Sequence, residues 1–135
     1  MEAPNTTLSL TKIEGATRQT NAAIEAFVCG HFDIAITLAG AAEGMLERDG
    51  PHMFSYMRDS SRVQDQDVKK KEWIAVLNLE RDWLKHPGGA ETLLIERGHA
   101  AFMIARAASK LPTWNKRMDE FKVWLLNNID DLAGA

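Results

Sequence analysis

Residues 11–46 decide the fold of this 135-residue chain, and they read TKIEGATRQTNAAIEAFVCGHFDIAITLAGAAEGML. Thr11 and Glu14 have the spacing of a capping box, in which the two side chains satisfy each other's backbone N–H groups at a helix start. Apolar residues then recur at helical spacing, and Gly30 can adopt the left-handed conformation that often ends a helix. The pattern predicts a helix over residues 12–29.

A second helix follows almost at once. Asp33 is a suitable N-cap, because its carboxylate can accept hydrogen bonds from the first free N–H groups of a helix. The run from Ile34 to Arg48 carries an apolar stripe at helical spacing, and the dipeptide Gly50-Pro51 closes it. Since the link to the first helix has only about three residues, we expect an antiparallel helical hairpin.

A third long helix is predicted over residues 67–86. It must end near His86, because the residue before Pro87 is driven out of the α conformation. The residues between the second and third helices, 51–66, fit either a short helix or a packed loop.

Two more helices are predicted over residues 91–110 and 112–129, the last beginning at Pro112, a residue favoured in the first helical turn. No run alternates polar and apolar residues as a strand does. We therefore expect an all-α fold in which the whole chain forms one antiparallel helical bundle, with four long helices and short helical segments. Residues 1–10 are expected to be a frayed lead-in and residues 130–135 a tail.

The composition excludes several classes of protein. Apolar residues make up 45% and charged residues 26% of the sequence, the usage of a folded domain rather than a disordered chain. The single cysteine, Cys29, excludes an intrachain disulfide and a multi-cysteine metal site. A net charge of −3 argues against a general nucleic-acid coat, although not against one local cationic site.

The sequence also sets expectations about location and bound groups. No apolar run is long enough to span a membrane, and the segment Met1–Thr11 lacks the features of a secretory signal. The histidines show no spacing typical of metal ligands. We therefore expect a cytoplasmic protein without membrane contact, metal or cofactor.

The third predicted helix carries an unusual polar face. Five polar side chains fall within an arc of roughly 140° on an ideal helix; they are Asn78, Arg81, Asp82, Lys85 and His86. Arg81 offers a planar cation that fits phosphate oxygens, and His86 can exchange a proton near neutral pH. The same residue types are also common on an ordinary solvated helix face, so spacing alone leaves both interpretations open.

The other members of this face can support the first two. Asp82 lies one turn before His86 and can accept a hydrogen bond from its imidazole ring, while Asn78 can hold Arg81 or Asp82. Glu43, on the second helix, is either a half-buried partner for a cation such as Arg81 or an ordinary boundary residue. Glu80 falls on the apolar side of its helix, where it either pairs with a buried cation or marks a second interface.

The motif formed by Arg81, Asp82, three further residues and His86 resembles the Arg-polar-x-x-x-His signature of the HEPN superfamily of small helical-bundle domains. As in that family, the motif lies at the end of a long, later helix. The alanine-rich second helix with its internal Glu43 is also similar to an early HEPN helix. The resemblance extends over the helical layout from about 12 to 129.

This resemblance implies a metal-independent endoribonuclease of the toxin or defence type, active as a homodimer in which two motifs face one cleft. Arg81 would bind the scissile phosphate and stabilise its charge, and His86 would act as general base on the ribose 2′-OH or general acid on the leaving oxygen. Asp82 would orient them. The implied products are a 2′,3′-cyclic phosphate and a 5′-OH, and DNA would not be cut. An antitoxin or other partner protein is also implied.

Two alternatives stay open from the sequence. One is a non-catalytic module of the same fold, which binds a nucleotide, an anion or a partner protein through residues such as Asn78, Lys85 and Glu43. The other is a structural dimer subunit of a larger complex, with the polar face as its interface.

Overall fold

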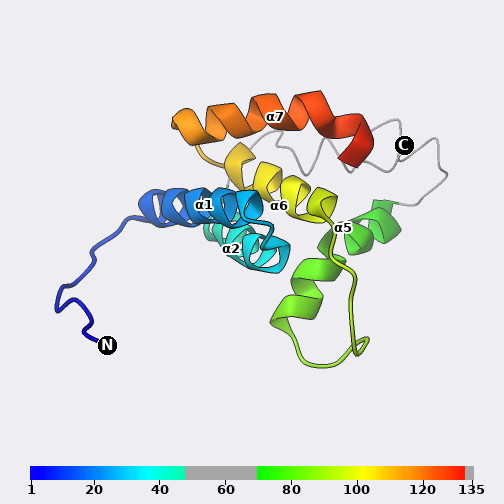
Figure 1. Ribbon diagram of the computed structural model, residues 1–135, viewed down its shortest axis with the longest axis horizontal. Coiled ribbons are helices and arrows are strands. Elements are labelled where there is room, and N and C mark those ends of the chain that lie inside the picture. Colours follow the sequence, from blue (N-terminus) through cyan, green and yellow to red (C-terminus); the bar gives the residue numbers. More distant parts are fainter. Residues whose placement is uncertain (48–69, 133–135) are drawn as a thin grey trace.

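The computed structural model describes residues 1–47 and 70–132, with the side chains of residues 1–47 and 78–132. This part of the chain forms five helices and no strand, in the order α1 (Lys12–Val28), α2 (Phe32–Met45), α5 (Lys70–Lys85), α6 (Arg97–Ser109) and α7 (Lys116–Leu132) (Figure 1). The predicted all-α bundle is confirmed at this level. Residues 51–66 and the predicted helix start at residue 67 lie outside the described residues.

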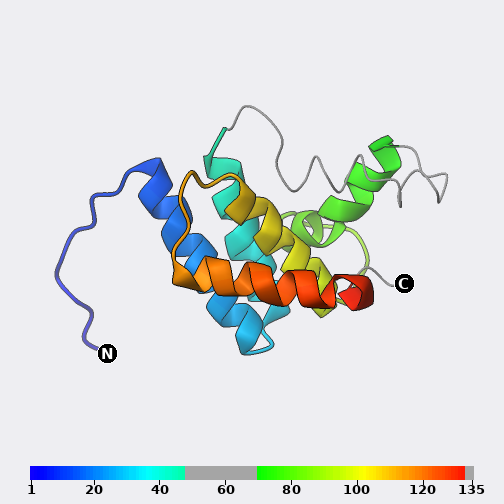
Figure 2. The ribbon, with the colours of Figure 1, turned by 90° about the horizontal axis from the view of Figure 1, so that it is seen from above.

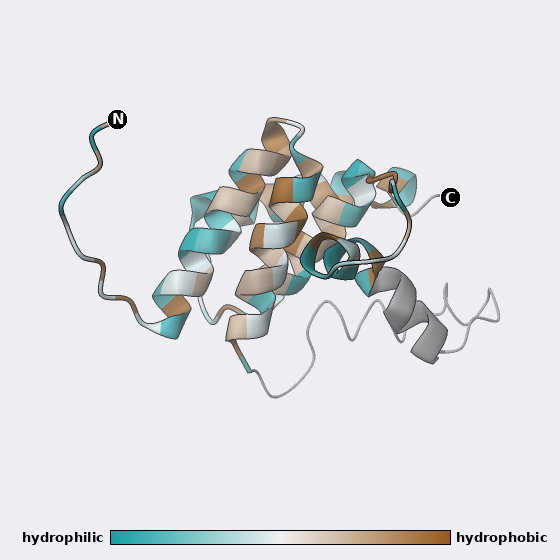
Figure 3. Ribbon diagram, turned by 90° about the horizontal axis from the view of Figure 1, so that it is seen from below, coloured by the Kyte–Doolittle hydropathy of each residue, from teal (hydrophilic) through white to brown (hydrophobic). Residues whose placement is uncertain are grey.

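The helices α1 and α2 form the predicted hairpin, and α6 lies between this hairpin and α7 (Figures 1 and 2). α5 packs beside α2 at one end of the bundle (Figure 1). In Figure 3, α1 and α2 carry both apolar and polar residues, as expected of helices that pack one side on a core. None of the described helices is long and apolar enough to cross a membrane.

The core is built largely of alanine. Its fully buried members include Ala23 in α1, Ala35 and Ala39 in α2, and Ala100 and Ala101 in α6. Small side chains let the helix axes come close together.

The start of α1 is as predicted. The Glu14 backbone N–H donates to Thr11 Oγ1 (3.1 Å), and the Thr11 N–H donates to Glu14 Oε1 (3.2 Å). The helix ends at Val28, and Gly30 follows with a φ of 80°. Such a positive φ favours glycine, so this residue turns the chain towards α2.

The predicted N-cap of α2 is wrong. α2 begins at Phe32, so that His31 is the N-cap and Asp33 lies inside the first turn. The physical reason is the tight turn, in which the His31 N–H donates to Ala26 O (2.8 Å) and so fixes where the next helix can start. Asp33 still suits its position, because a negative charge is favourable at the positive end of a helix.

The end of α2 also differs from the prediction, because the helix stops at Met45 instead of Arg48. Leu46 is already extended, with φ −119° and ψ 136°. The Lys110 ammonium donates to two carbonyl oxygens at this end, Glu43 O (3.2 Å) and Leu46 O (3.3 Å). A cation from another helix therefore satisfies the carbonyls that a further helical turn would have used.

The last two helices start later than predicted. α6 begins at Arg97 rather than residue 91, because Glu96 is extended and the preceding segment is a loop. α7 begins at Lys116 rather than at Pro112, because the Asn115 side chain caps it by accepting from Met118 N (3.0 Å). α7 then continues to Leu132, through residues expected to belong to the tail.

Candidate functional site

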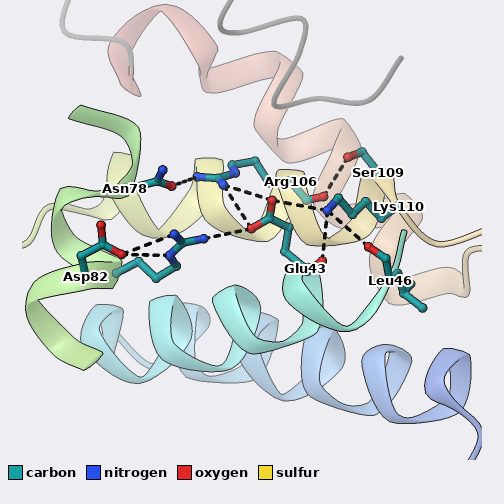
Figure 4. Close-up of polar contacts among 8 residues, drawn as sticks. Glu43, Leu46, Asn78, Asp82, Arg106, Ser109 and Lys110 are labelled. Carbon is teal, nitrogen blue, oxygen red and sulfur yellow. Dashed lines mark hydrogen bonds and ion pairs between the residues drawn. The ribbon is translucent and has the colours of Figure 1, made fainter. Parts of the chain in front are cut away.

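A buried charged cluster lies where α2, α5 and α6 meet (Figure 4). We name it the Glu43 cluster, and it consists of Glu43, Arg81, Arg106 and Lys110. Glu43 is only 6% exposed and Arg106 only 2%. The Arg106 Nη2 donates to both Glu43 carboxylate oxygens, at 3.0 and 3.1 Å. The second interpretation of Glu43, a mere boundary residue, is therefore wrong, and the first is correct.

The Arg81 side chain joins the cluster from α5. Its Nη1 lies 3.4 Å from Glu43 Oε2, while its Nε and Nη2 lie 3.4 and 3.3 Å from Asp82 Oδ1. All three guanidinium nitrogens thus face carboxylates, yet 29% of the side chain is still exposed. The cation is held at the edge of the protein and not sealed inside it.

A glycine in α2 makes room for this arrangement. A Cβ added at Gly40 would lie 2.9 Å from Arg81 Cδ and 3.0 Å from Cγ. Any larger residue would push the Arg81 stem away from its place beside Glu43. No local sequence pattern connects a glycine in α2 with an arginine in α5.

Asn78 has a different partner from the two that were expected. Its Oδ1 accepts a hydrogen bond from Arg106 Nη1 at 2.8 Å. Asn78 therefore supports the buried guanidinium of α6, whereas no hydrogen bond joins it to Arg81 or Asp82 among the described contacts. The predicted orienting role of Asn78 is corrected accordingly.

Electrostatically, the cluster carries more positive than negative groups. Three cations surround one buried carboxylate, with the Lys110 Nζ 3.6 Å from Glu43 Oε1, and Asp82 adds a second negative charge at the surface. Burial lowers the pKa of the Arg106 guanidinium below its ordinary value, and the Glu43 carboxylate opposes this by favouring the charged form. The site is locally cationic in a protein of net charge −3.

Lys85 and His86 are exposed at the end of the same helix. Lys85 is the last residue of α5, and His86 follows it, with its backbone N–H bonded to Asp82 O (3.0 Å). The expected hydrogen bond from the His86 ring to the Asp82 carboxylate is absent from the described contacts, because Asp82 binds Arg81 instead. Among the described contacts, no hydrogen bond joins Arg81 to His86 within one chain.

The turn after His86 has a fixed shape. Gly88 and Gly89 have φ values of 87° and 85°, and the Trp83 Nε1 donates to Ala90 O at 2.7 Å. A Cβ at Gly89 would lie 3.2 Å from Trp83 Cδ1, so the turn folds back against the indole ring. These contacts hold the turn that follows the exposed His86 against α5.

Glu80, expected either to pair with a buried cation or to mark a second interface, lies beside the partly exposed ring of His99. This carboxylate is 7% exposed, and its Oε1 lies 3.2 Å from His99 Nδ1. The same nitrogen lies 3.3 Å from the backbone N–H of Glu96. His99 thus connects α5 to the start of α6.

Sequence reasoning missed Arg106 and Lys110 as members of the site. Arg106 is the only charged residue in the alanine-rich stretch from residue 100 to residue 108. A charge in such a stretch is almost never buried without a partner, so this residue could have been matched to Glu43. The described residues contain no group of three or more metal-ligating side chains.

Comparison with known proteins adds no further information. We find no significant match to this chain among protein-family models, curated proteins or solved structures. The resemblance to HEPN domains therefore stays a prediction from the sequence motif.

Proposed function

We propose that this chain is a HEPN-like module that binds RNA at the exposed end of α5 and cleaves it without a metal when two copies face each other. The observation that carries the proposal is the position of Arg81. Its guanidinium is fixed by Glu43 and Asp82 but keeps 29% of the side chain accessible, on the same helix end as the exposed Lys85 and His86.

The charge of the site supports phosphate binding. Three cations surround the single buried carboxylate of Glu43, so the cluster retains positive charge next to Arg81. A guanidinium that is already held in place loses little conformational freedom when it binds an anion. In many enzymes, preorganised charge of this kind also makes the largest single contribution to stabilising the transition state.

The proposed reaction needs one His86 and one Arg81 in the shared cleft. The His86 ring takes the proton of the ribose 2′-OH, and the 2′ oxygen attacks the adjacent phosphorus. The bond to the 5′ oxygen breaks, that oxygen takes a proton from water, and the protonated ring returns its proton to the solvent. The products are a 2′,3′-cyclic phosphate and a 5′-OH, and Arg81 stabilises the negative charge on the phosphoryl oxygens. Because no described hydrogen bond joins Arg81 to His86 within one chain, the partner copy completes the site.

The test is cleavage of a fluorescent single-stranded RNA in excess EDTA. We expect Arg81→Lys and His86→Gln each to lower the rate by about 100-fold or more, as removal of a general acid–base group does. His31→Gln is the matched control, since His31 is an exposed histidine outside the site. Cleavage by the wild type no faster than by an Arg81→Ala, His86→Ala double variant would contradict the proposal.

A mixing experiment tests the shared cleft. Arg81→Ala and His86→Ala proteins are inactive alone in this scheme, but a mixed dimer contains one intact arginine and one intact histidine from different copies. We expect the mixture to recover measurable activity after unfolding and refolding together. Equal inactivity of the mixture and of each variant would refute the shared cleft.

A second candidate function is a non-catalytic anion-binding module. The observation that favours it is that all three nitrogens of Arg81 already face Glu43 or Asp82 within 3.4 Å. In that case RNA or a nucleotide binds without being cut, and Asp82→Asn strengthens binding by releasing the guanidinium. An electrophoretic shift with intact RNA, together with no cleavage by wild type, would select this function.

A further inference from the structure

A hollow of about 880 Å³ lies away from the Glu43 cluster, and none of the residues that line it belongs to that cluster. It is formed by the end of α1, the turn into α2, the first residue of α6 and part of α7. This volume lies within the range of roughly 300–1,000 Å³ that small-molecule sites occupy. The hollow is therefore large enough for a compact organic ligand.

Aromatic rings form its walls. Phe27 meets Phe121 edge to face, with ring centroids 5.7 Å apart, and meets Trp124 with centroids 5.2 Å apart. Phe32 approaches Phe27 from the turn side, at 5.6 Å. This wall, with Phe121 buried and the other three rings partly buried, offers faces and edges against which a flat ligand can stack.

The charged side chains at the rim are not equivalent. Arg117 is paired with Glu25, and Glu120 lies 3.6 Å from Lys116, so both rim carboxylates already have a cation. Arg97 has no carboxylate within ion-pair distance among the described residues, and its guanidinium lies over the Trp124 ring at 5.9 Å from the centroid. One exposed cation next to an aromatic wall thus has no anionic partner among the residues that the structure describes.

We propose that this hollow is a binding site for a small aromatic carboxylate. The flat ring packs among Phe27, Phe121 and Trp124, and the carboxylate pairs with the planar fork of Arg97, which suits two oxygens at once. Charge complementarity selects the acid over a neutral compound of the same shape. The proposal is independent of the ribonuclease proposal, since it uses different residues.

The probe is 2-naphthoate, and 2-naphthamide is its neutral counterpart. Binding is followed by the ¹H–¹⁵N NMR signals of the full chain, including the Trp124 indole. We expect a Kd of about 1 mM for the acid, as for other small ligands, with shifts centred on Gly30, Phe121 and Trp124. Arg97→Gln is expected to weaken the acid about two- to fivefold, the usual effect of one exposed ion pair, and to leave the amide unchanged.

Lys122→Gln is the matched control, because Lys122 also lies over a tryptophan ring, Trp114 at 5.6 Å, but does not line the hollow. Cys29 provides a readout that is independent of NMR. It is exposed, it lines the hollow and it is the only thiol, so bound 2-naphthoate should slow its alkylation by iodoacetamide. Equal affinity for acid and amide, shifts outside the hollow, or no binding up to the solubility limit would each overturn the proposal.

Discussion

Replacing Glu43 by glutamine is the sharpest test of how the bundle is held together. The substitution keeps the shape of the side chain and removes one negative charge from a site where the residue is 6% exposed. Arg106, which is 2% exposed, then loses the carboxylate that accepts two of its hydrogen bonds, at 3.0 and 3.1 Å. The glutamine amide oxygen can still accept one of these hydrogen bonds, and Asn78 Oδ1 accepts another, but the buried guanidinium has lost its anion.

The expected cost follows from this geometry. Removing one partner of a buried ion pair typically costs 3–5 kcal/mol, because the other charge stays desolvated, and we expect about 3 kcal/mol here. The lower end applies because the hydrogen bond to Asn78 remains and Arg81 has access to water. For a domain of this size the change corresponds to a fall in Tm of roughly 10 °C.

The assay is equilibrium unfolding in urea, followed by circular dichroism at the helical band and by tryptophan fluorescence. Glu120→Gln is the matched control, since its exposed pair with Lys116 should contribute less than about 1 kcal/mol. Arg106→Met should cost less than Glu43→Gln, because Glu43 keeps Arg81 and Lys110 within 3.6 Å. Equal stability of Glu43→Gln and Glu120→Gln, or a larger loss in Arg106→Met, would refute the reasoning.

Four further substitutions test the packing. Thr20→Val should stabilise the protein by about 1 kcal/mol in thermal unfolding, because the Thr20 hydroxyl is buried without a hydrogen-bond partner among the described residues. Gly44→Ala should raise the free energy of unfolding by about 0.5–1 kcal/mol in urea, since an added Cβ meets open space. Gly98→Ala should instead lower it by about 1–3 kcal/mol, since its Cβ would lie 2.7 Å from a backbone oxygen of α7. Trp83→Phe removes the hydrogen bond to Ala90 O, so hydrogen exchange in the turn after α5 should become faster while the midpoint of unfolding falls by less than for Glu43→Gln.

The existence of the described helices could be predicted from the sequence, but many of their ends could not. Thr11 and Glu14 lie only three positions apart, so the capping box could be predicted from spacing alone, and the structure confirms it. The end of α2 could not be predicted, because Lys110, which satisfies its carbonyls, lies 64 residues beyond Leu46. Helix ends that depend on distant side chains leave no local pattern.

The candidate site shows the same division. The placement of Arg81 and Asp82 on one helix face follows from the helical period, and the pairing of Arg81 with Glu43 was one of two stated alternatives. The partner of Asn78 was not predicted, since it depends on how α6 packs against α5. No hydrogen bond joins the His86 ring to Asp82 among the described contacts, and the Asp82 carboxylate lies 3.3 Å from Arg81 Nη2 instead.

The Glu43 cluster also has a consequence for the order of folding. Its hydrogen bonds join residues 28, 38, 63 and 67 positions apart, so each needs two distant segments of the chain to meet, and the complete cluster needs α2, α5 and α6 together. Contacts between such distant residues are slow to form, while the local hairpin of α1 and α2 closes early. We therefore expect α5 to pack onto the bundle last during folding and to detach first. The helix end that carries Arg81 and His86 would then be the most readily released part of the described bundle.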